Sequence, residues 1–185
     1  MKLKYIFSIL LVLIIVSWFY IVLRNKNIWD NIISEEINTL NALPITYSLE
    51  SAIDDGYYYE KEAIDKIPNS IIKFLSYVDD NARIKLKIAF EKEKRLILTN
   101  IFYESKKFTV INYYINHASN KRSWEKDEYK YLIVSLNQEN KIYSYYLTNN
   151  TNLYKSIKEN PDYNIYDQDV FYLFSRSYAA KEPEL

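Results

Sequence analysis

A histidine stands near two serines around residue 117, and a serine hydrolase uses this combination of side chains. His117 is the single histidine of the chain, and Ser119 and Ser123 follow it. In the hydrolases that carry a nucleophile elbow, glycines flank the serine and allow the backbone to bend sharply. The chain has one glycine, Gly56, far from these serines. We therefore assign no catalytic role here and expect His117 to lie in a surface loop.

Carboxylates offer two further kinds of chemistry. Asp162, Asp167 and Asp169 lie close together in the sequence, and carboxylates in a loop can converge on a calcium ion. Acidic residues are equally expected where a helix starts, because they face the positive end of its dipole. Two carboxylates at a suitable separation can also hydrolyse a glycosidic bond, and a sequence does not reveal that separation. We assign no catalytic, cofactor or metal-binding residue, and we keep an envelope hydrolase that uses carboxylates as the alternative function.

Tyrosines indicate a binding role more directly, because aromatic rings with hydroxyl groups suit surfaces that recognise peptides or glycans. Successive side chains of a strand point to opposite faces, so at least one residue of the Tyr57 to Tyr59 run faces outward if the run is extended. The alternative is that the 20 tyrosines reflect a composition typical of an AT-rich genome and pack as ordinary strand residues. The predicted partner-binding residues are all aromatic: Tyr57, Tyr58, Tyr59, Tyr143, Tyr145, Phe171 and Phe174.

The overall composition excludes several partners and chemistries. The chain has 24 Lys and Arg against 24 Asp and Glu, so its formal net charge is 0. A nucleic-acid partner is not expected, because phosphate neutralisation needs a basic surface. The absence of cysteine excludes disulfides, thiolate catalysis, cysteine–zinc sites and a lipidated cysteine.

Residues 1–24 predict a signal-anchor transmembrane helix. Tyr5 to Leu23 is an uncharged run of nineteen residues, and a helix of that length spans a hydrocarbon core of roughly 30 Å. A cleaved signal peptide would have a shorter apolar region that ends in small residues. Four residues precede the run and no second such run follows. We therefore expect one span of the cytoplasmic membrane, with the N-terminus in the cytoplasm and the C-terminal domain outside.

Residues 25–45 predict an amphipathic stalk helix. Pro44 is expected to end this helix. The helix could pack on the following domain, form a dimer seam or lie on the lipid surface, and we favour the first. Its apolar residues recur at three- and four-residue spacing: Ile28, Trp29, Ile32, Ile33, Ile37 and Leu40.

Residues 46–185 predict an α+β domain in which helices cover an antiparallel meander of about five strands. Ser48 and Gly56 have the types that begin and end a short helix. Asn69 or Ser70 is expected to cap a second helix, whose apolar face runs from Ile71 to Val78. Five apolar runs predict the strands, and the polar stretch at 116–128 is interpreted as a loop. The five runs cover 83–91, 96–104, 107–115, 129–136 and 141–148.

The two faces of this sheet must both be covered, since the second and third runs are apolar at both parities. In the first run Ile88 has the parity of the core, and Lys87 faces water. The helix at 70–79 covers one face. Val170, Phe171 and Phe174 recur at helical spacing, so we expect residues 170–178 to cover the other face.

One resemblance joins several of these segments. Along the chain stand SLESAIDDG at 48–56, a helix from Asn69 to Val78, RIKL at 83–86 and a strand that includes Ile101, followed by KKF at 106–108. Over about residues 46–115 this order resembles an uncharacterised domain family of small cell-envelope lipoproteins from low-GC Gram-positive bacteria. The resemblance implies an envelope location and a compact α/β module without a catalytic signature. The chain departs from the pattern in its membrane helix, in its additional C-terminal half and at Tyr57, where aspartate is more usual.

Together these features predict a single-pass bacterial envelope protein whose outer domain binds a protein or cell-wall partner and is not an enzyme. The carboxylate hydrolase is the alternative, and two acids in one pocket would favour it. A pilin-like subunit is not favoured, because no glycine precedes the apolar helix.

Overall fold

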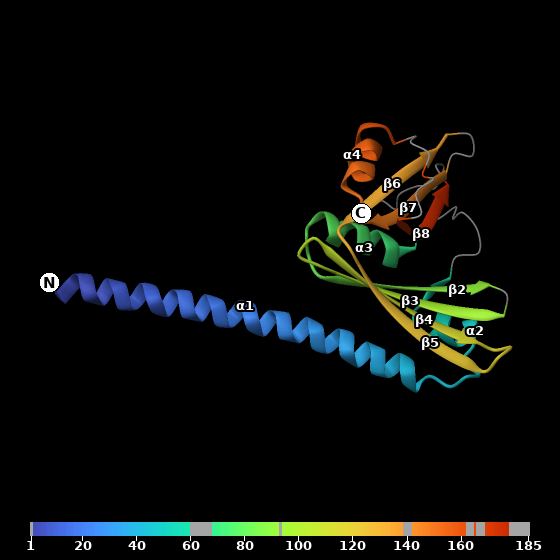
Figure 1. Ribbon diagram of the computed structural model, residues 1–185, viewed down its shortest axis with the longest axis horizontal. Coiled ribbons are helices and arrows are strands. Elements are labelled where there is room, and N and C mark those ends of the chain that lie inside the picture. Colours follow the sequence, from blue (N-terminus) through green and yellow to red (C-terminus); the bar gives the residue numbers. More distant parts are fainter. Residues whose placement is uncertain are drawn as a thin grey trace. The chain divides into compact units, whose positions relative to one another are not determined.

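The structure is a computed structural model that describes residues 2–59, 68–92, 94–138, 142–161, 165 and 169–177 (Figure 1). The chain divides into two compact units, Met1–Leu43 and Pro44–Leu185. We refer to the second unit as the C-terminal domain. Each unit is described by itself.

The first unit is one helix, α1 (Lys2–Ala42). The segments expected at 1–24 and 25–45 are therefore continuous, and the helix ends just before Pro44, as predicted. Over residues 10–21 its large apolar side chains are 54 to 65% exposed. Among the residues that the structure describes, no helix combines the length and the apolar character that crossing a membrane requires.

The C-terminal domain opens with the short helix α2 (Leu49–Asp54). Its N-cap is Ser48, whose Oγ accepts a hydrogen bond from the Ser51 amide at 3.1 Å. Gly56 follows the helix at φ +82°, a conformation that glycine adopts without strain. Both end signals are confirmed. The chain then enters β1 (Tyr58–Tyr59).

The larger sheet has five strands in the order β1-β2-β3-β4-β5, in which β1 is parallel to β2 and the rest form an antiparallel meander. Its strands β2 (Ile84–Lys92), β3 (Arg95–Glu104) and β4 (Lys107–Asn116) confirm the first three predicted strands. The fourth strand of the meander, β5 (Lys121–Tyr129), was predicted as a loop, and this prediction is wrong. Eight of its nine side chains are exposed, so the strand has no apolar period to reveal it.

Helix α3 (Asn69–Asp79) packs on one face of this sheet, and its residues Ile71 and Phe74 are fully buried. The N-cap is Pro68, without a side-chain cap, so the expected cap at Asn69 or Ser70 is wrong. The core includes Ile88 of β2 at 0% exposure, which confirms the predicted parity of that strand.

The last two predicted strands form a separate sheet instead of extending the meander. It has the order β6-β7-β8, with β6 (Tyr131–Asn137), β7 (Ile142–Thr148) and β8 (Val170–Ser177). The predicted hairpin is confirmed by the antiparallel pairing of Asn137 with Ile142. Helix α4 (Thr151–Glu159) covers one face through Leu153 and Ile157, and Asn150 caps it.

The other face of the small sheet joins the core around α3, so α3 lies between the two sheets (Figure 1). Leu173 and Phe174 of β8 share this core with Ile71 and Phe74. Residues 170–177 are thus a strand instead of a helical stripe, and they lie on the α3 side of the larger sheet. The expectation that they cover its opposite face is wrong; Tyr178 lies outside the described residues.

The opposite face of the larger sheet is approached by α2 and the turn after it. The ring of Tyr57 lies under Lys87 Nζ at 4.8 Å, and its hydroxyl accepts a hydrogen bond from Asn100 Nδ2 at 3.1 Å. Lys87 is consequently half-buried. The predicted wet face is therefore partly covered, and its Ala89 is fully buried.

Candidate functional site

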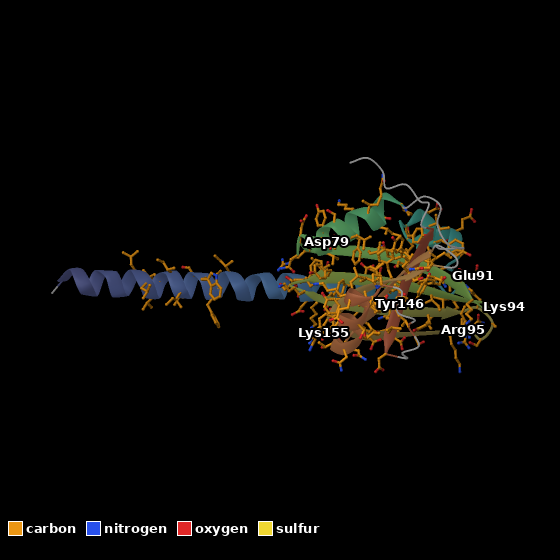
Figure 2. All side chains as sticks on the ribbon, turned by 90° about the horizontal axis from the view of Figure 1, so that it is seen from above. Asp79, Glu91, Lys94, Arg95, Tyr146 and Lys155 are labelled. Carbon is orange, nitrogen blue, oxygen red and sulfur yellow. The ribbon has the colours of Figure 1, made fainter. Side chains whose placement is uncertain are left out.

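A groove of about 1040 Å³ opens at the end of the domain where the chain passes from the larger to the smaller sheet. We call it the tyrosine–lysine groove. Its lining comes from the end of α3, the β3–β4 turn, the β5–β6 crossover, and α4 with the residue Asn149 near its start. Asp79, labelled in Figure 2, marks the α3 wall. The aromatic and charged residues that line the whole groove are Tyr103, Phe108, Tyr129, Tyr131, Tyr154, Asp79, Glu128, Lys106, Lys107 and Lys130.

The aromatic rings of the groove are held in place by one another. Tyr131 and Tyr154 stack with their centroids 4.5 Å apart and their planes 17° from parallel. The Tyr131 hydroxyl also lies 3.3 Å from Thr151 Oγ1. Tyr103 packs on Phe108 at 4.7 Å. Tyr103 and Phe108 are 4% and 2% exposed and form the buried base of the groove. The half-buried rings of Tyr131 and Tyr154 can present apolar surface to a ligand at little cost in side-chain entropy.

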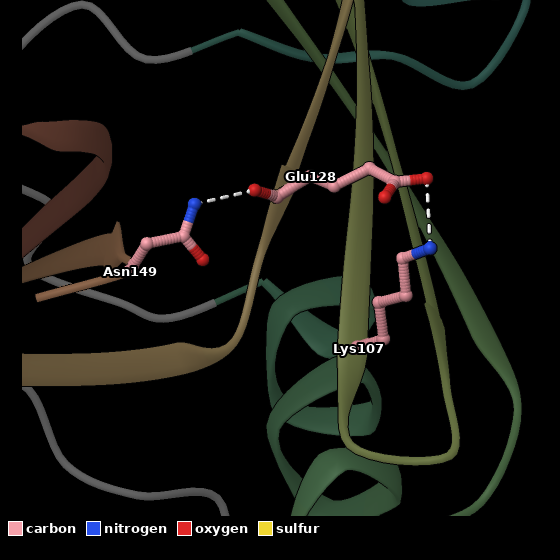
Figure 3. A network of polar contacts seen from close by, with 3 residues as sticks. All are labelled: Lys107, Glu128 and Asn149. Carbon is pink, nitrogen blue, oxygen red and sulfur yellow. Dashed lines mark hydrogen bonds and ion pairs between the residues drawn. The ribbon is translucent and has the colours of Figure 1, made fainter. Parts of the chain in front are cut away.

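One ion pair and one hydrogen bond link Glu128 of β5 to neighbouring elements of the groove (Figure 3). Lys107 Nζ lies 2.8 Å from Glu128 Oε1, and Asn149 Nδ2 donates to the carbonyl oxygen of Glu128 at 2.7 Å. The hydrogen bond from Lys107 lowers the pKa of the Glu128 carboxyl, and burial opposes this effect. Glu128 is therefore ionised at neutral pH. Lys106 and Lys130 bring further positive charge to the groove, against Asp79.

The β3–β4 turn that carries Lys106 has an uncommon backbone. Glu104 pairs with Lys107, so Ser105 and Lys106 are the two turn residues, and their φ angles are 51° and 63°. Two-residue hairpin turns with both φ positive usually hold asparagine or glycine. Strain of this kind concentrates at sites of function, and here it sets the position of Lys106 on the groove wall.

A further left-handed residue, just after the end of α3, bonds to one of the groove tyrosines. Asn81 has a φ of 55°, and its Oδ1 accepts a hydrogen bond from the Tyr103 hydroxyl at 2.9 Å. Burial raises the pKa of Tyr103, while the backbone amide of Lys106 acts in the opposite direction. The phenol is therefore protonated and serves as a donor.

Three of the sequence-predicted binding residues are buried, which corrects the expectation that they face a partner. Tyr57 is 6%, Tyr145 is 4% and Phe174 is 0% exposed. Tyr145 and Phe174 stack at 4.5 Å inside the core. They were chosen as aromatic residues that suit recognition surfaces, and their rings are instead buried in the core.

The remaining predicted residues are half-buried and do not converge on one site. Tyr58 and Tyr59 form β1 beside β2, whereas Tyr143 and Phe171 pack against the core from the small sheet. The ring of Phe171 lies 5.8 Å from that of Tyr129, a groove residue. A binding role for these residues stays a prediction.

His117 and Asp169, the described members of the histidine and acidic-cluster candidates, make hydrogen bonds that support the fold. His117 Nδ1 lies 3.1 Å from the carbonyl oxygen of Ile45 and so ties the β4–β5 turn to the start of the domain. The carbonyl oxygen of Asp169 accepts a hydrogen bond from Thr148 Oγ1; Asp162 and Asp167 lie outside the described residues. Within the described ranges, no group of three or more His, Cys, Asp or Glu residues could hold a metal ion.

Sequence reasoning missed the tyrosines of the groove. Tyr103, Tyr129, Tyr131 and Tyr154 come from β3, the β5–β6 crossover and α4. No spacing along the chain links them, because the crossover between the sheets brings them together. The one local signal is that Tyr129 and Tyr131 flank Lys130 next to a largely polar stretch.

Comparison of the chain with models of protein families, with curated proteins and with solved structures finds no match.

Proposed function

We propose that the chain is a single-pass bacterial envelope protein whose C-terminal domain is a non-enzymatic binding module that takes a protein or cell-wall partner in the tyrosine–lysine groove. The groove is the observation that carries the proposal. It combines ordered tyrosine rings with Lys106 and Lys130. Such a lining suits an extended partner that offers apolar or sugar faces to the rings and anionic groups to the lysines.

The lowered pKa of Glu128 favours binding over carboxylate hydrolysis as the function of the groove. A glycosidase needs one carboxyl group that is protonated near neutral pH, and such a group has a raised pKa. Glu128 has a lowered pKa because Lys107 bonds to it. Asp79 alone does not make the pair that hydrolysis requires.

The membrane location rests on the sequence and on the surface of α1. The uncharged run from Tyr5 to Leu23 has the length of a span. Over residues 10–21 the apolar side chains are exposed all round the helix, and a helix that is apolar on every side belongs in a membrane or in a protein core. The N-terminus is proposed to be cytoplasmic and the domain to be outside.

Location and orientation are tested with a carboxy-terminal tag in cells. The tagged protein is expected to stay with membranes through an alkaline carbonate wash and to be digested by protease added to spheroplasts. Release into the medium would contradict the anchor. Protection from the protease would contradict the orientation.

The groove is tested by capture of partners from the protein's own envelope with the full chain as bait. Lys130→Glu reverses an exposed charge in the groove. Lys155→Glu is the matched control, because Lys155 is an exposed lysine of α4 and is not among the groove residues (Figure 2). A partner of the groove should be lost with the first variant and kept with the second. Equal capture by both variants and the wild type would contradict a site in the groove.

A further inference from the structure

Strand β5 forms the outer edge of the larger sheet. It is nine residues long, and its side chains from Lys121 to Glu128 are all exposed. A long exposed edge offers its backbone N–H and C=O groups to another strand, and charged side chains are the usual protection against unwanted pairing. An occupant of this edge therefore has to match the charges of β5.

The direction of the edge groups follows from two hydrogen bonds near the end of β5. The carbonyl oxygen of Glu128 accepts from Asn149 Nδ2, and the amide of Lys130 donates to the carbonyl oxygen of Thr148. Both groups thus face away from β4. Because the direction alternates along an antiparallel strand, the N–H and C=O groups of Trp124 and Lys126 also face outward.

The charges of β5 are ordered so that the strand complements itself. Its start is basic, with Lys121 and Arg122, and its end is acidic, with Asp127 and Glu128. An antiparallel copy places the basic start against the acidic end. Opposite charges directly across a strand pair stabilise it, and like charges destabilise it.

Charge also selects one register. If two β5 strands pair about a two-fold axis at Glu125, Trp124 faces Lys126 and Ser123 faces Asp127. Pairings whose residue numbers add to an odd value would bring residues of opposite sheet faces together, so the axis passes through a residue. An axis at Trp124 sets Arg122 against Lys126, and an axis at Lys126 sets that lysine against itself.

The axis at Glu125 brings two carboxylates near each other, and the fold reduces the repulsion between them. Glu125 Oε1 accepts a hydrogen bond from the Tyr114 hydroxyl, and Asn112 Nδ2 lies 3.5 Å from the same atom. Tyr114 and Asn112 belong to β4. The carboxylate is therefore drawn over β4 and away from the edge.

We infer that β5 pairs with β5 of a second copy of this chain, antiparallel and centred on Glu125, so that the two larger sheets become one continuous sheet. The exposed ring of Trp124, 45% accessible, then meets Lys126 of the second copy, which supplies a cation–π contact. In this register Arg122 and Lys121 of the second copy lie across from Glu128 and Tyr129, which also line the tyrosine–lysine groove.

The test uses single cysteines in the full chain, which has no cysteine of its own. Residues that face each other across a strand pair without mutual hydrogen bonds have Cα atoms about 4.5 Å apart, and a disulfide forms at about 4.4–6.8 Å. Glu125→Cys is expected to yield a disulfide-linked dimer when the purified protein in mild detergent is oxidised with copper phenanthroline. The light-scattering mass of the unmodified protein should also be that of a dimer.

Two matched cysteine variants test the proposed register. Ser123→Cys and Asp127→Cys lie two residues to either side of the axis, so each is roughly 14 Å from its own copy and should stay uncrosslinked. Co-expressed with different tags, these two variants should crosslink to each other. A monomeric mass, no crosslink at Glu125→Cys, or equal self-crosslinking of all three single variants would overturn the inference.

Discussion

Two strands of this protein lie at the edge of a sheet and differ in almost every other respect. β8 closes the small sheet and buries Leu173 and Phe174 completely. β5 closes the larger sheet and exposes every side chain before Tyr129. An edge position determines only which backbone groups are unpaired. The elements that lie over the two faces of the strand determine what it contributes to stability.

The sequence pattern fails to predict a strand for a different reason in β8 and in β5. In β8 the pairing with β7 is irregular, because Tyr146 faces Tyr172 and Tyr145 faces Phe174. Leu173 is the additional residue of this bulge. A bulge places neighbouring residues on one face, so the apolar positions of β8 follow a helical spacing. In β5 there is no apolar spacing to detect.

The largest effect is expected from removing β8. Deletion of residues 170–185 uncovers several large side chains that stabilise by roughly 1.5 to 3 kcal/mol each when buried. A domain with a total stability of about 5 to 15 kcal/mol should then unfold or aggregate. Circular dichroism melting of the full chain and of the truncated chain measures the loss. An unchanged melting temperature would show that β8 is not part of the core.

A pair of aromatic truncations compares the two edges directly. Phe174→Ala in β8 should destabilise by about 3 to 5 kcal/mol, because it opens a cavity in the core. Trp124→Ala in β5 should cost less than about 1 kcal/mol, as exposed positions do. Urea unfolding of both variants measures the free energies. Similar losses would mean that β5 is covered as β8 is.

A smaller effect is expected where β5 contacts β4. Burial raises the pKa of Tyr114, and the hydrogen bond to Glu125 raises it further. The folded state therefore holds this proton more tightly, and the resulting stability is present below the unfolded pKa of about 10 and is lost as pH rises. Tyr114→Phe lacks this contribution, so the advantage of the wild type should shrink above that pH in urea titrations. A constant difference across alkaline pH would contradict the assignment.

The smallest effect is expected at the exposed end of β5. Lys107 lowers the pKa of Glu128, so the ion pair contributes stability at neutral pH that is lost as pH falls below about 4.5, the ordinary pKa of the group. Glu128→Gln should lower the melting temperature slightly at neutral pH and leave it unchanged in acid. An equal shift at both pH values would indicate that Glu128 acts through packing.

Much of the larger sheet could be predicted because its strands follow simple rules. Ile84, Leu86, Ile88 and Phe90 alternate along β2. Leu86 and Ile88 are buried in the core, and Ile84 and Phe90 pack against it. The apolar face of α3 packs where its spacing requires. The ends of α2 could also be predicted from residue types, since Ser48 caps the helix and Gly56 follows it with positive φ.

The candidate site could not be predicted in this way. The sequence-based choice favoured clustered aromatics such as Tyr145 and Phe174, and these are core residues. The groove residues are single tyrosines at the ends of strands and at the start of a helix. Their rings meet because the chain leaves β5 and begins β6 in another sheet, which depends on contacts between residues that are distant in the sequence.

The sequence by itself determined the apolar segment at the N-terminus, the helix ends of α2 and the inward face of β2 and α3, because each depends on residues within a few positions of one another. Only the tertiary structure decided that the strands divide into two sheets, that β8 is a bulged strand in the core and that β5 is a strand at all. In β5 the backbone pairing with β4 over nine residue pairs makes the strand, and backbone hydrogen bonds are the same for every side chain. The side chains of β5 therefore do not predict that this segment pairs with β4 as a strand.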